Sequence, residues 1–214
     1  MASREEGEVA VRLAREAIST AVLSGSRRDA AQPFRDRSLP ELFDAPRGVF
    51  VTLERASDRR LRGCIGYPLP VYPLRLAVPR VAVAAALDDA RFPPVARGEL
   101  LKLTVEVSLL TLPEPMEAEP RSSLPGQVRV GHDGLIVDGA GMSGLLLPQV
   151  AVEQGWDSEE FLGETCLKGG LPRDAWRSPY VRVRRFSSER FRELRPEGEV
   201  VAEGLSGAPA MRSG

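Results

Sequence analysis

The chain has 214 residues, of which 43% are hydrophobic and 28% are charged, as in an ordinary globular protein. Its 29 basic and 30 acidic residues nearly balance, which argues against a dedicated nucleic-acid-binding protein with a basic surface. No apolar run approaches the ~20 residues that cross a bilayer, and the first residues are too polar for a signal peptide. We therefore expect a cytosolic protein without a membrane partner.

The first half of the chain predicts helices packed on antiparallel strands. Apolar residues recur with a period near 3.6 after Ser3, which forms a capping box with Glu6, so a helix begins there. A polar loop should follow over 24–40. Further along, the residue pattern predicts a hairpin of two strands at 48–53 and 61–67. A helix at 74–90, which Pro79 restarts, and a strongly alternating strand at 101–110 should follow.

The second half predicts shorter elements. The Pro- and Glu-rich loop 111–126 is a suitable boundary between two lobes. We expect a second hairpin at 128–137 that turns at His132–Gly134, and a short strand at 145–147. A helix at 158–168, stopped by a left-handed Gly169, and an exposed strand at 181–186 should follow. The tail 196–214 should fray. Strands and helices follow one another without regular βαβ alternation, so the predicted fold class is α+β.

Two common site motifs are unconvincing here. The run from Gly139 to Gly144 reads G-x-G-x-x-G, but an extended apolar segment follows it where a dinucleotide site needs a helix. A glycine-rich connection explains it better. Two isolated cysteines and the single His132 lack the local spacing of a zinc site, although a carboxylate-rich metal site stays open. The sequence therefore predicts no metal residue and identifies no cofactor.

The segment around Cys64 is the best candidate for chemistry. Gly63 and Gly66 flank the thiol with bare backbone, and glycine inside a strand often marks a close approach of a ligand or another backbone. Arg62 lies two residues away on the same predicted strand face, where a cation favours the thiolate. The alternative is that Cys64 is a small buried hydrophobe, the commonest state of a free cysteine.

Three further candidates have plain structural alternatives. Glu106 lies on the polar face of its strand, where it either lines a cleft or faces solvent. His132 is a candidate general base, but turn histidines are more often simply exposed. Arg182 and Arg184 share one strand face within a basic segment, which suits either phosphate contacts or a charged edge strand.

The hexapeptide Leu-Arg-Gly-Cys-Ile-Gly at 61–66 resembles the signature of the AMMECR family. The resemblance covers about residues 9–195 in the expected order. Its other segments are residues 48–53, 84–94, 99–110, 134–137, 145–150, 153–157 and 161–168, with Trp176, Phe186 and Phe191 near the end.

This resemblance implies one AMMECR-type domain over 4–195, made of two α+β lobes with a cleft between them. Each lobe would be a mainly antiparallel sheet with packed helices. The family brings no established reaction or cofactor. Its members are similar to partners of Memo-type and radical S-adenosylmethionine proteins. Carried over by position, the motif residues are Arg62, Cys64, Glu106, Gln149, Glu153, Trp156, Asp157, Cys166 and Lys168.

Two functional hypotheses follow. In the first, the chain is an enzyme or part of a modification pathway, with Cys64 as nucleophile or covalent carrier, Arg62 lowering its pKa and Glu106 transferring protons. Gly63, Gly66 and the other motif residues would then bind the substrate. In the second, the chain is a non-catalytic module that binds a protein or a nucleic acid, for which Arg182 is the natural contact.

Overall fold

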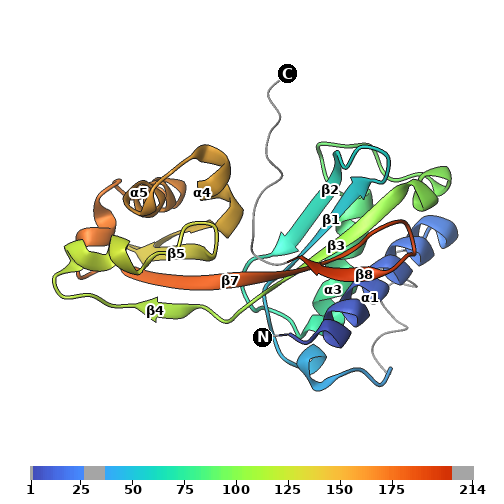
Figure 1. Cartoon of the computed structure of the whole chain (residues 1–214), viewed down its shortest axis with the longest axis horizontal. Helices are drawn as coiled ribbons and strands as arrows, with labels where there is room; N and C mark the ends of the chain where they lie inside the picture. Colours follow the sequence, from blue (N-terminus) through green and yellow to red (C-terminus); the bar gives the residue numbers. More distant parts are fainter. Residues whose placement is uncertain (1, 27–36, 204–214) are drawn as a thin grey trace. The chain divides into compact units, whose positions relative to one another are not determined.

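The computed structural model describes residues 2–26 and 37–203, which divide into two compact units (Figure 1). Unit 1 consists of the described residues up to 110 together with 189–203, and unit 2 consists of residues 111–188. The long strand β7 (Arg182–Glu193) contributes residues to both. Each unit has its own hydrophobic core, so each is described by itself.

Unit 1 is an antiparallel sheet with strand order β2-β1-β3-β7-β8. Along β1, Val49, Val51 and Leu53 are fully buried on one face, whereas Thr52 and Glu54 lie on the other. This period of two is the one expected from the sequence. The bounds of the other strands are Val49–Arg55 for β1, Leu61–Tyr67 for β2, Leu103–Leu110 for β3 and Val200–Glu203 for β8.

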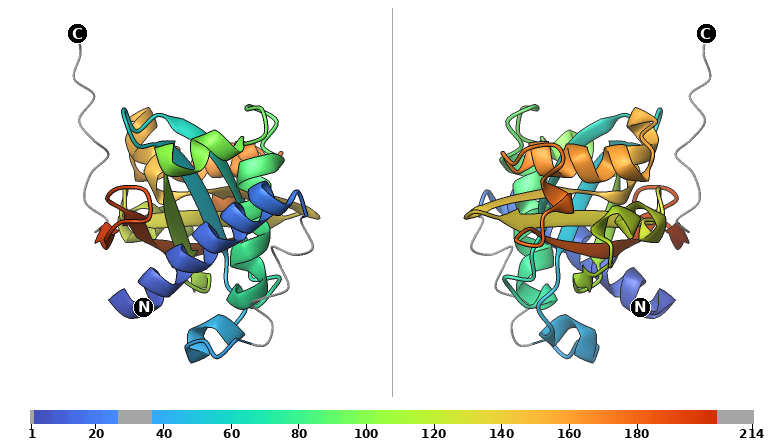
Figure 2. Two further views of the ribbon diagram at one scale, coloured as in Figure 1. Left: turned by 90° about the vertical axis from the view of Figure 1, so that its right-hand side faces the viewer. Right: turned by 90° about the vertical axis from the view of Figure 1, so that its left-hand side faces the viewer.

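Two helices, α1 (Arg4–Ser24) and α3 (Leu74–Leu87), cover the apolar face of this sheet (Figure 2). The predicted capping box is present, because the Ser3 side chain accepts from the Glu6 backbone N–H and the Glu6 carboxylate accepts from that of Ser3. Pro79 does not restart α3 as expected. The helix continues through it because burial of its apolar residues outweighs one missing backbone hydrogen bond.

A buried ion pair fixes α1 to the sheet of unit 1. The Glu193 carboxylate is fully buried and accepts hydrogen bonds from the guanidinium of Arg15 and, at 3.1 Å, from the backbone N–H of Val105. Arg15 also donates to the carbonyl oxygens of Leu100 (3.0 Å) and Leu103 (2.6 Å). Every charge in this cluster is compensated, which is the condition for burying one.

Unit 2 is a smaller antiparallel sheet with strand order β4-β7-β5-β6. The helix α5 packs against β5 and β6, and Phe161 and Trp176 lie in the core (Figure 1). The bounds are Glu114–Met116 for β4, Asp133–Gly139 for β5, Met142–Leu146 for β6, Pro148–Gln154 for α4 and Ser158–Lys168 for α5. Short 3-10 turns lie at Glu41–Asp44, Arg97–Lys102, Arg121–Gln127 and Ala175–Arg177.

The second hairpin differs from the prediction. Residues 128–130 form no strand, and the hairpin joins β5 to β6 through Ala140 and Gly141. Both turn residues have positive φ, 51° and 77°, as a two-residue hairpin turn of type I′ requires. The glycine-rich run therefore makes the turn, which agrees with rejecting it as a dinucleotide site. His132 lies instead in the turn that precedes β5.

The C-terminal elements also differ. The left-handed residue after α5 is Gly170, with φ 78°, and not the predicted Gly169, whose φ is −84°. β7 is twice as long as the predicted strand 181–186, α4 was not predicted, and residues 200–203 of the expected tail form β8 on β7. Residues 27–36 of the predicted loop and 204–214 of the tail lie outside the described residues. Every helix in the described ranges is too short or too polar to cross a membrane.

Candidate functional site

Two residues predicted from the sequence, Cys64 and Glu106, lie in one row across the sheet of unit 1, with Thr52 between them. Thr52 on β1 is the register partner of Cys64 on β2 and also of Glu106 on β3. Register partners on antiparallel strands place their side chains side by side on one face. The Thr52 hydroxyl lies 3.4 Å from the Cys64 sulfur, within hydrogen-bonding distance. The row lies on the sheet face opposite to α1 and α3, and Cys64 is half-buried.

Glu106 has an unusual electrostatic environment for a strand carboxylate. Burial raises the pKa of Glu106 to about 7; Arg190 opposes this rise, whereas the negative charges of Glu203 and Glu54 add to it. Among the described residues, the Glu106 side chain makes no ion pair or hydrogen bond. A carboxyl group with a pKa near neutrality both accepts and donates a proton readily. Glu106 is half-buried, so it is neither fully exposed to solvent nor enclosed in the core.

Arg62 has a different partner from the one the sequence suggested. The register between β1 and β2 shifts after Leu53, so Arg62 occupies a β-bulge and the simple alternation with Cys64 is interrupted. Its guanidinium donates two hydrogen bonds to Glu99, at 3.0 and 3.1 Å, and lies 5.8 Å from the ring centre of Phe92. In the described parts of the chain, no hydrogen bond or ion pair joins it to the Cys64 side chain.

The backbone of Cys64 is held by a pair of residues that the sequence analysis did not single out. Because β2 is an edge strand, the Cys64 N–H has no strand partner and donates instead to Asp89 Oδ2 at 2.8 Å. Arg91 pairs with Asp89 at 2.7 Å and donates to the Cys64 carbonyl at 3.2 Å. These hydrogen bonds, from Arg91 above all, hold the pKa of Asp89 well below its usual range. The only sequence signal was an acid–arginine pair just after a helix.

Both glycines beside the thiol have a packing explanation. A Cβ on Gly63 would lie 2.1 Å from the backbone oxygen of Ala85 in α3, so the helix touches the strand there. A Cβ on Gly66 would lie 2.3 Å from the ring of Phe50. Close approach of the helix and of an aromatic ring, rather than of a ligand, is thus sufficient to require glycine at both positions.

Gly63→Ala should lower the free energy of unfolding by ~1–3 kcal/mol or more. The added methyl group collides with the backbone of α3 at Ala85, and this backbone can move only if the whole helix moves. Gly98→Ala is the matched control, since a Cβ there meets no atom within 4 Å. Urea denaturation followed by circular dichroism compares the two variants. Equal stability of both would show that α3 does not approach Gly63 as closely as described.

The remaining six motif residues lie in unit 2, and three of them have structural roles. Asp157 caps α5 in a capping box with Glu160. Cys166 is fully buried, and burial raises the pKa of its thiol. Trp156 is half-buried and packs on the core of unit 2. The other three, Gln149, Glu153 and Lys168, are exposed. Among the described residues, no hydrogen bond or ion pair joins any two of these six side chains.

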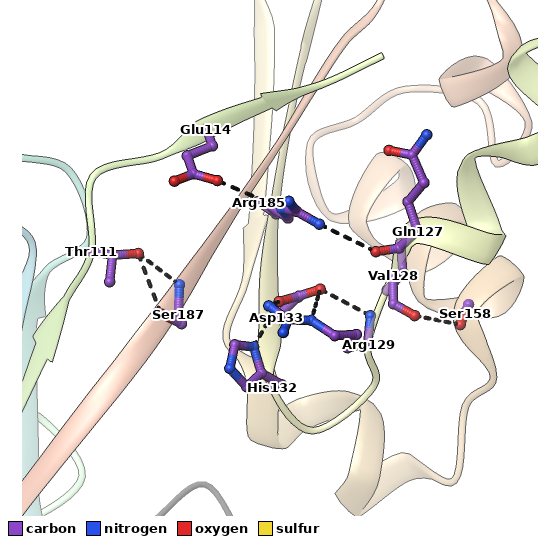
Figure 3. Close-up of polar contacts among 10 residues, drawn as sticks. All are labelled: Thr111, Glu114, Gln127, Val128, Arg129, His132, Asp133, Ser158, Arg185 and Ser187. Carbon is purple, nitrogen blue, oxygen red and sulfur yellow. Dashed lines mark hydrogen bonds and ion pairs between the residues drawn. The ribbon is translucent and has the colours of Figure 1, made fainter. Parts of the chain in front are cut away.

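His132 is bound to a neighbouring carboxylate (Figure 3). Its Nδ1 lies 2.8 Å from Oδ1 of the buried Asp133, which also accepts hydrogen bonds from the backbone and guanidinium of Arg129. Although burial acts against it, these hydrogen bonds hold the pKa of Asp133 below its usual value. The cluster fixes the turn before β5. In residues 2–26 and 37–203, no group of three or more His, Cys, Asp or Glu side chains is arranged to hold a metal ion.

Comparison with known proteins identifies the family. A model of the AMMECR1 family matches residues 11–191. A protein of Thermococcus gammatolerans is 52% identical over 199 residues, covering 92% of this chain and 94% of its own, and one of Methanothermobacter thermautotrophicus is 51% identical over 191 residues, covering 89% and 96%. The crystal structure of the uncharacterized protein PH0010 from Pyrococcus horikoshii is similar, with 48% identity, a TM-score of 0.77, and coverage of 93% and 97%. These matches confirm the resemblance read from the sequence, and the chain belongs to the AMMECR1 family.

Proposed function

We propose that the row formed by Cys64, Thr52 and Glu106 is a thiol-based catalytic site, in which Cys64 is the nucleophile or covalent carrier of a modification reaction. The observation that carries the proposal is the juxtaposition of these three side chains on one sheet face. The short distance between the Thr52 hydroxyl and the sulfur supports it, because a hydroxyl that donates to sulfur stabilises the thiolate. The proposal assigns no role at the sulfur to Arg62, since its guanidinium donates two hydrogen bonds to Glu99 and none to the Cys64 side chain among the described residues.

The proposed chemistry is a transfer of a group from an electrophilic carbon to sulfur. The sulfur forms a bond to that carbon as the bond to the leaving group breaks. The thiol proton passes through the Thr52 hydroxyl and a bridging water to the Glu106 carboxylate, since no direct hydrogen bond joins Thr52 to Glu106 among the described residues, and the resulting carboxylic acid returns it to the leaving group. A carboxyl pKa of about 7 suits both steps, because the group then accepts and releases a proton near neutral pH.

The Asp89–Arg91 pair would position the nucleophile. It holds both the N–H and the carbonyl of Cys64, so the main chain on either side of the thiol is fixed by hydrogen bonds. A nucleophile must be kept in a defined position to benefit from proximity, and a rigid strand edge provides that. Asp89 is thus a positioning residue that acts through the backbone. Arg91 also interacts electrostatically with the Cys64 side chain, which, after Asp89, helps to raise the pKa of its guanidinium.

Iodoacetamide should alkylate Cys64 at least about ten times faster than Cys166, because a thiol must be accessible and ionised to react. The two thiols are compared in one sample by mass spectrometry of their peptides. Cys166 is the internal control, since it is fully buried and burial raises the pKa of its thiol. Equal, slow labelling of both thiols would contradict the proposal.

Thr52→Val should slow the alkylation of Cys64 about tenfold, because it removes the hydroxyl that donates to the sulfur while it keeps a similar shape. Thr52→Ser is the matched control and should restore most of the rate, since serine keeps the hydroxyl. If the valine and serine variants react alike, the hydroxyl has no part in activating the thiol, and the proposed proton path is wrong.

A further inference from the structure

Unit 2 has a strongly exposed aromatic side chain that lies outside its hydrophobic core. Tyr180, in the segment between the turn Ala175–Arg177 and β7, is 89% exposed. Its backbone N–H donates to the Ser178 hydroxyl at 3.3 Å, so the segment is held although the ring is free of the core. A single exposed tyrosine is common, and a partner is indicated only by what surrounds it.

Two hollows flank this ring. The first, about 470 Å³, lies between Tyr180, Arg182 and the β5–β6 turn. The second, about 580 Å³, is lined mainly by apolar side chains, among them Leu171, Pro172 and Val181. The turn residues Gly139 and Ala140 border both hollows, as Tyr180 does, and carry almost no side chain to fill them.

Arg182 gives the first hollow a free positive charge. Its register partner on β5 is Asp138, but the carboxylate of Asp138 already accepts hydrogen bonds from Arg184 at 2.8 Å and from Ser143 at 2.9 Å. In the part of unit 2 that the structure describes, Arg182 makes no ion pair. In the second hollow, by contrast, Arg177 is paired with Glu159 at 2.5 Å and lies over the Trp176 ring. The two hollows therefore differ in chemistry, one cationic and one apolar.

We propose that Tyr180, Arg182, Leu171, Pro172 and the turn Gly139–Ala140, here called the Tyr180 surface, bind an extended segment of a partner protein. The segment carries an aliphatic or aromatic residue two positions from an aspartate or glutamate, because alternate side chains of an extended peptide point the same way. The apolar side chain occupies the second hollow, the carboxylate binds the Arg182 guanidinium, and the chain crosses the Tyr180 ring between them. Tyrosine and arginine are also the residues that most often dominate protein interfaces.

This surface is independent of the proposed thiol site. All of its residues belong to unit 2, whereas Cys64, Thr52 and Glu106 belong to unit 1. A protein segment is favoured over a nucleic acid because the second hollow is lined mainly by apolar side chains, which offer no partner to a phosphate backbone. Nucleic acid is nevertheless included as a competing outcome in the experiment.

A phage library of random heptapeptides, panned on the immobilised full chain, tests the proposal. The wild-type protein should enrich peptides in which an apolar residue and an acidic residue are two positions apart. Arg182→Glu should enrich basic residues in place of the acidic one, and Tyr180→Ala should enrich no motif. Arg97→Glu is the matched control, since Arg97 is an exposed arginine of unit 1 without an ion pair among the described residues; it should select the wild-type motif.

A synthetic peptide of the selected sequence, labelled with fluorescein, then gives the affinities. The dissociation constant should rise at least about tenfold for Tyr180→Ala and for Arg182→Glu, and stay unchanged for Arg97→Glu and Cys64→Ser. Thermal unfolding confirms that the exposed substitutions leave the fold intact. No enriched motif, a motif that Arg182→Glu leaves unchanged, or tighter binding of an oligothymidylate of about twelve nucleotides than of any peptide would each overturn the proposal.

Discussion

Replacing Glu193 with alanine should lower the free energy of unfolding by about 3–5 kcal/mol, because it leaves a buried guanidinium without its counter-charge. The side chain of Arg15 is only 8% exposed, and Glu193 is its only carboxylate partner within 4 Å in the described chain. The substitution also removes the acceptor of the Val105 N–H in the middle of the sheet. Urea denaturation followed by circular dichroism at the helical band measures the loss.

The control for this prediction is an ion pair of the same type at the surface. Glu16 pairs with Arg37 at 2.8 Å, but both side chains are about half exposed. Glu16→Ala should therefore change the free energy of unfolding by no more than about 1 kcal/mol. A similarly small effect of Glu193→Ala would mean that water reaches the Arg15 guanidinium, which would contradict its described burial.

Between about pH 5 and pH 8, the wild-type protein should lose up to about 3 kcal/mol of stability relative to the Glu106→Gln variant. In the folded protein burial raises the pKa of Glu106 from its ordinary value of 4.5 to about 7. The folded state therefore binds more protons than the unfolded state between these two values. The stabilisation from the protonated carboxyl is complete below about 4.5 and is lost as the pH rises through about 7. Glutamine cannot titrate, so its variant lacks this loss.

The measurement is a series of urea denaturations of both proteins across that pH range. The difference between the two curves cancels the contributions of all groups they share. Parallel curves would show that Glu106 titrates as an exposed carboxylate, and the proposed proton acceptor would then have no special pKa. A growing advantage of the wild-type protein with rising pH would show that Glu106 is stabilised as the anion, which is the opposite of the stated cause.

The sequence was sufficient for elements that depend on local interactions. The capping box of Ser3 and Glu6 and that of Asp157 and Glu160 are formed by residues three positions apart, so they are readable without a fold. The strand β3 has Val105 and Val107 buried on the helix side and Glu106 on the other, as strict alternation requires. The resemblance in the segment around Cys64 and along the rest of the chain gave the family, which the family model confirms.

The sequence was insufficient where two local signals competed. Both the His132–Gly134 run and the Gly139–Gly141 run are turn signals, and the pairing of β5 with both β6 and β7 decided that the second closes the hairpin. The strand β8 contains only four residues in a stretch rich in glycine and glutamate, so no periodicity marks it. It forms because the last residues of β7 offer it a partner.

The candidate site shows the same division most clearly. Sequence alone selected Cys64, because a thiol between glycines is an unusual choice of residue, and Glu106, because it lies on the polar face of an alternating strand that either lines a cleft or faces solvent. Only the tertiary structure placed Thr52 between them, diverted Arg62 to Glu99 through a β-bulge, and brought Asp89 to the free edge of β2. Strand register, bulges and the burial that sets a pKa depend on segments far apart in the chain, and no local pattern encodes which of them will meet.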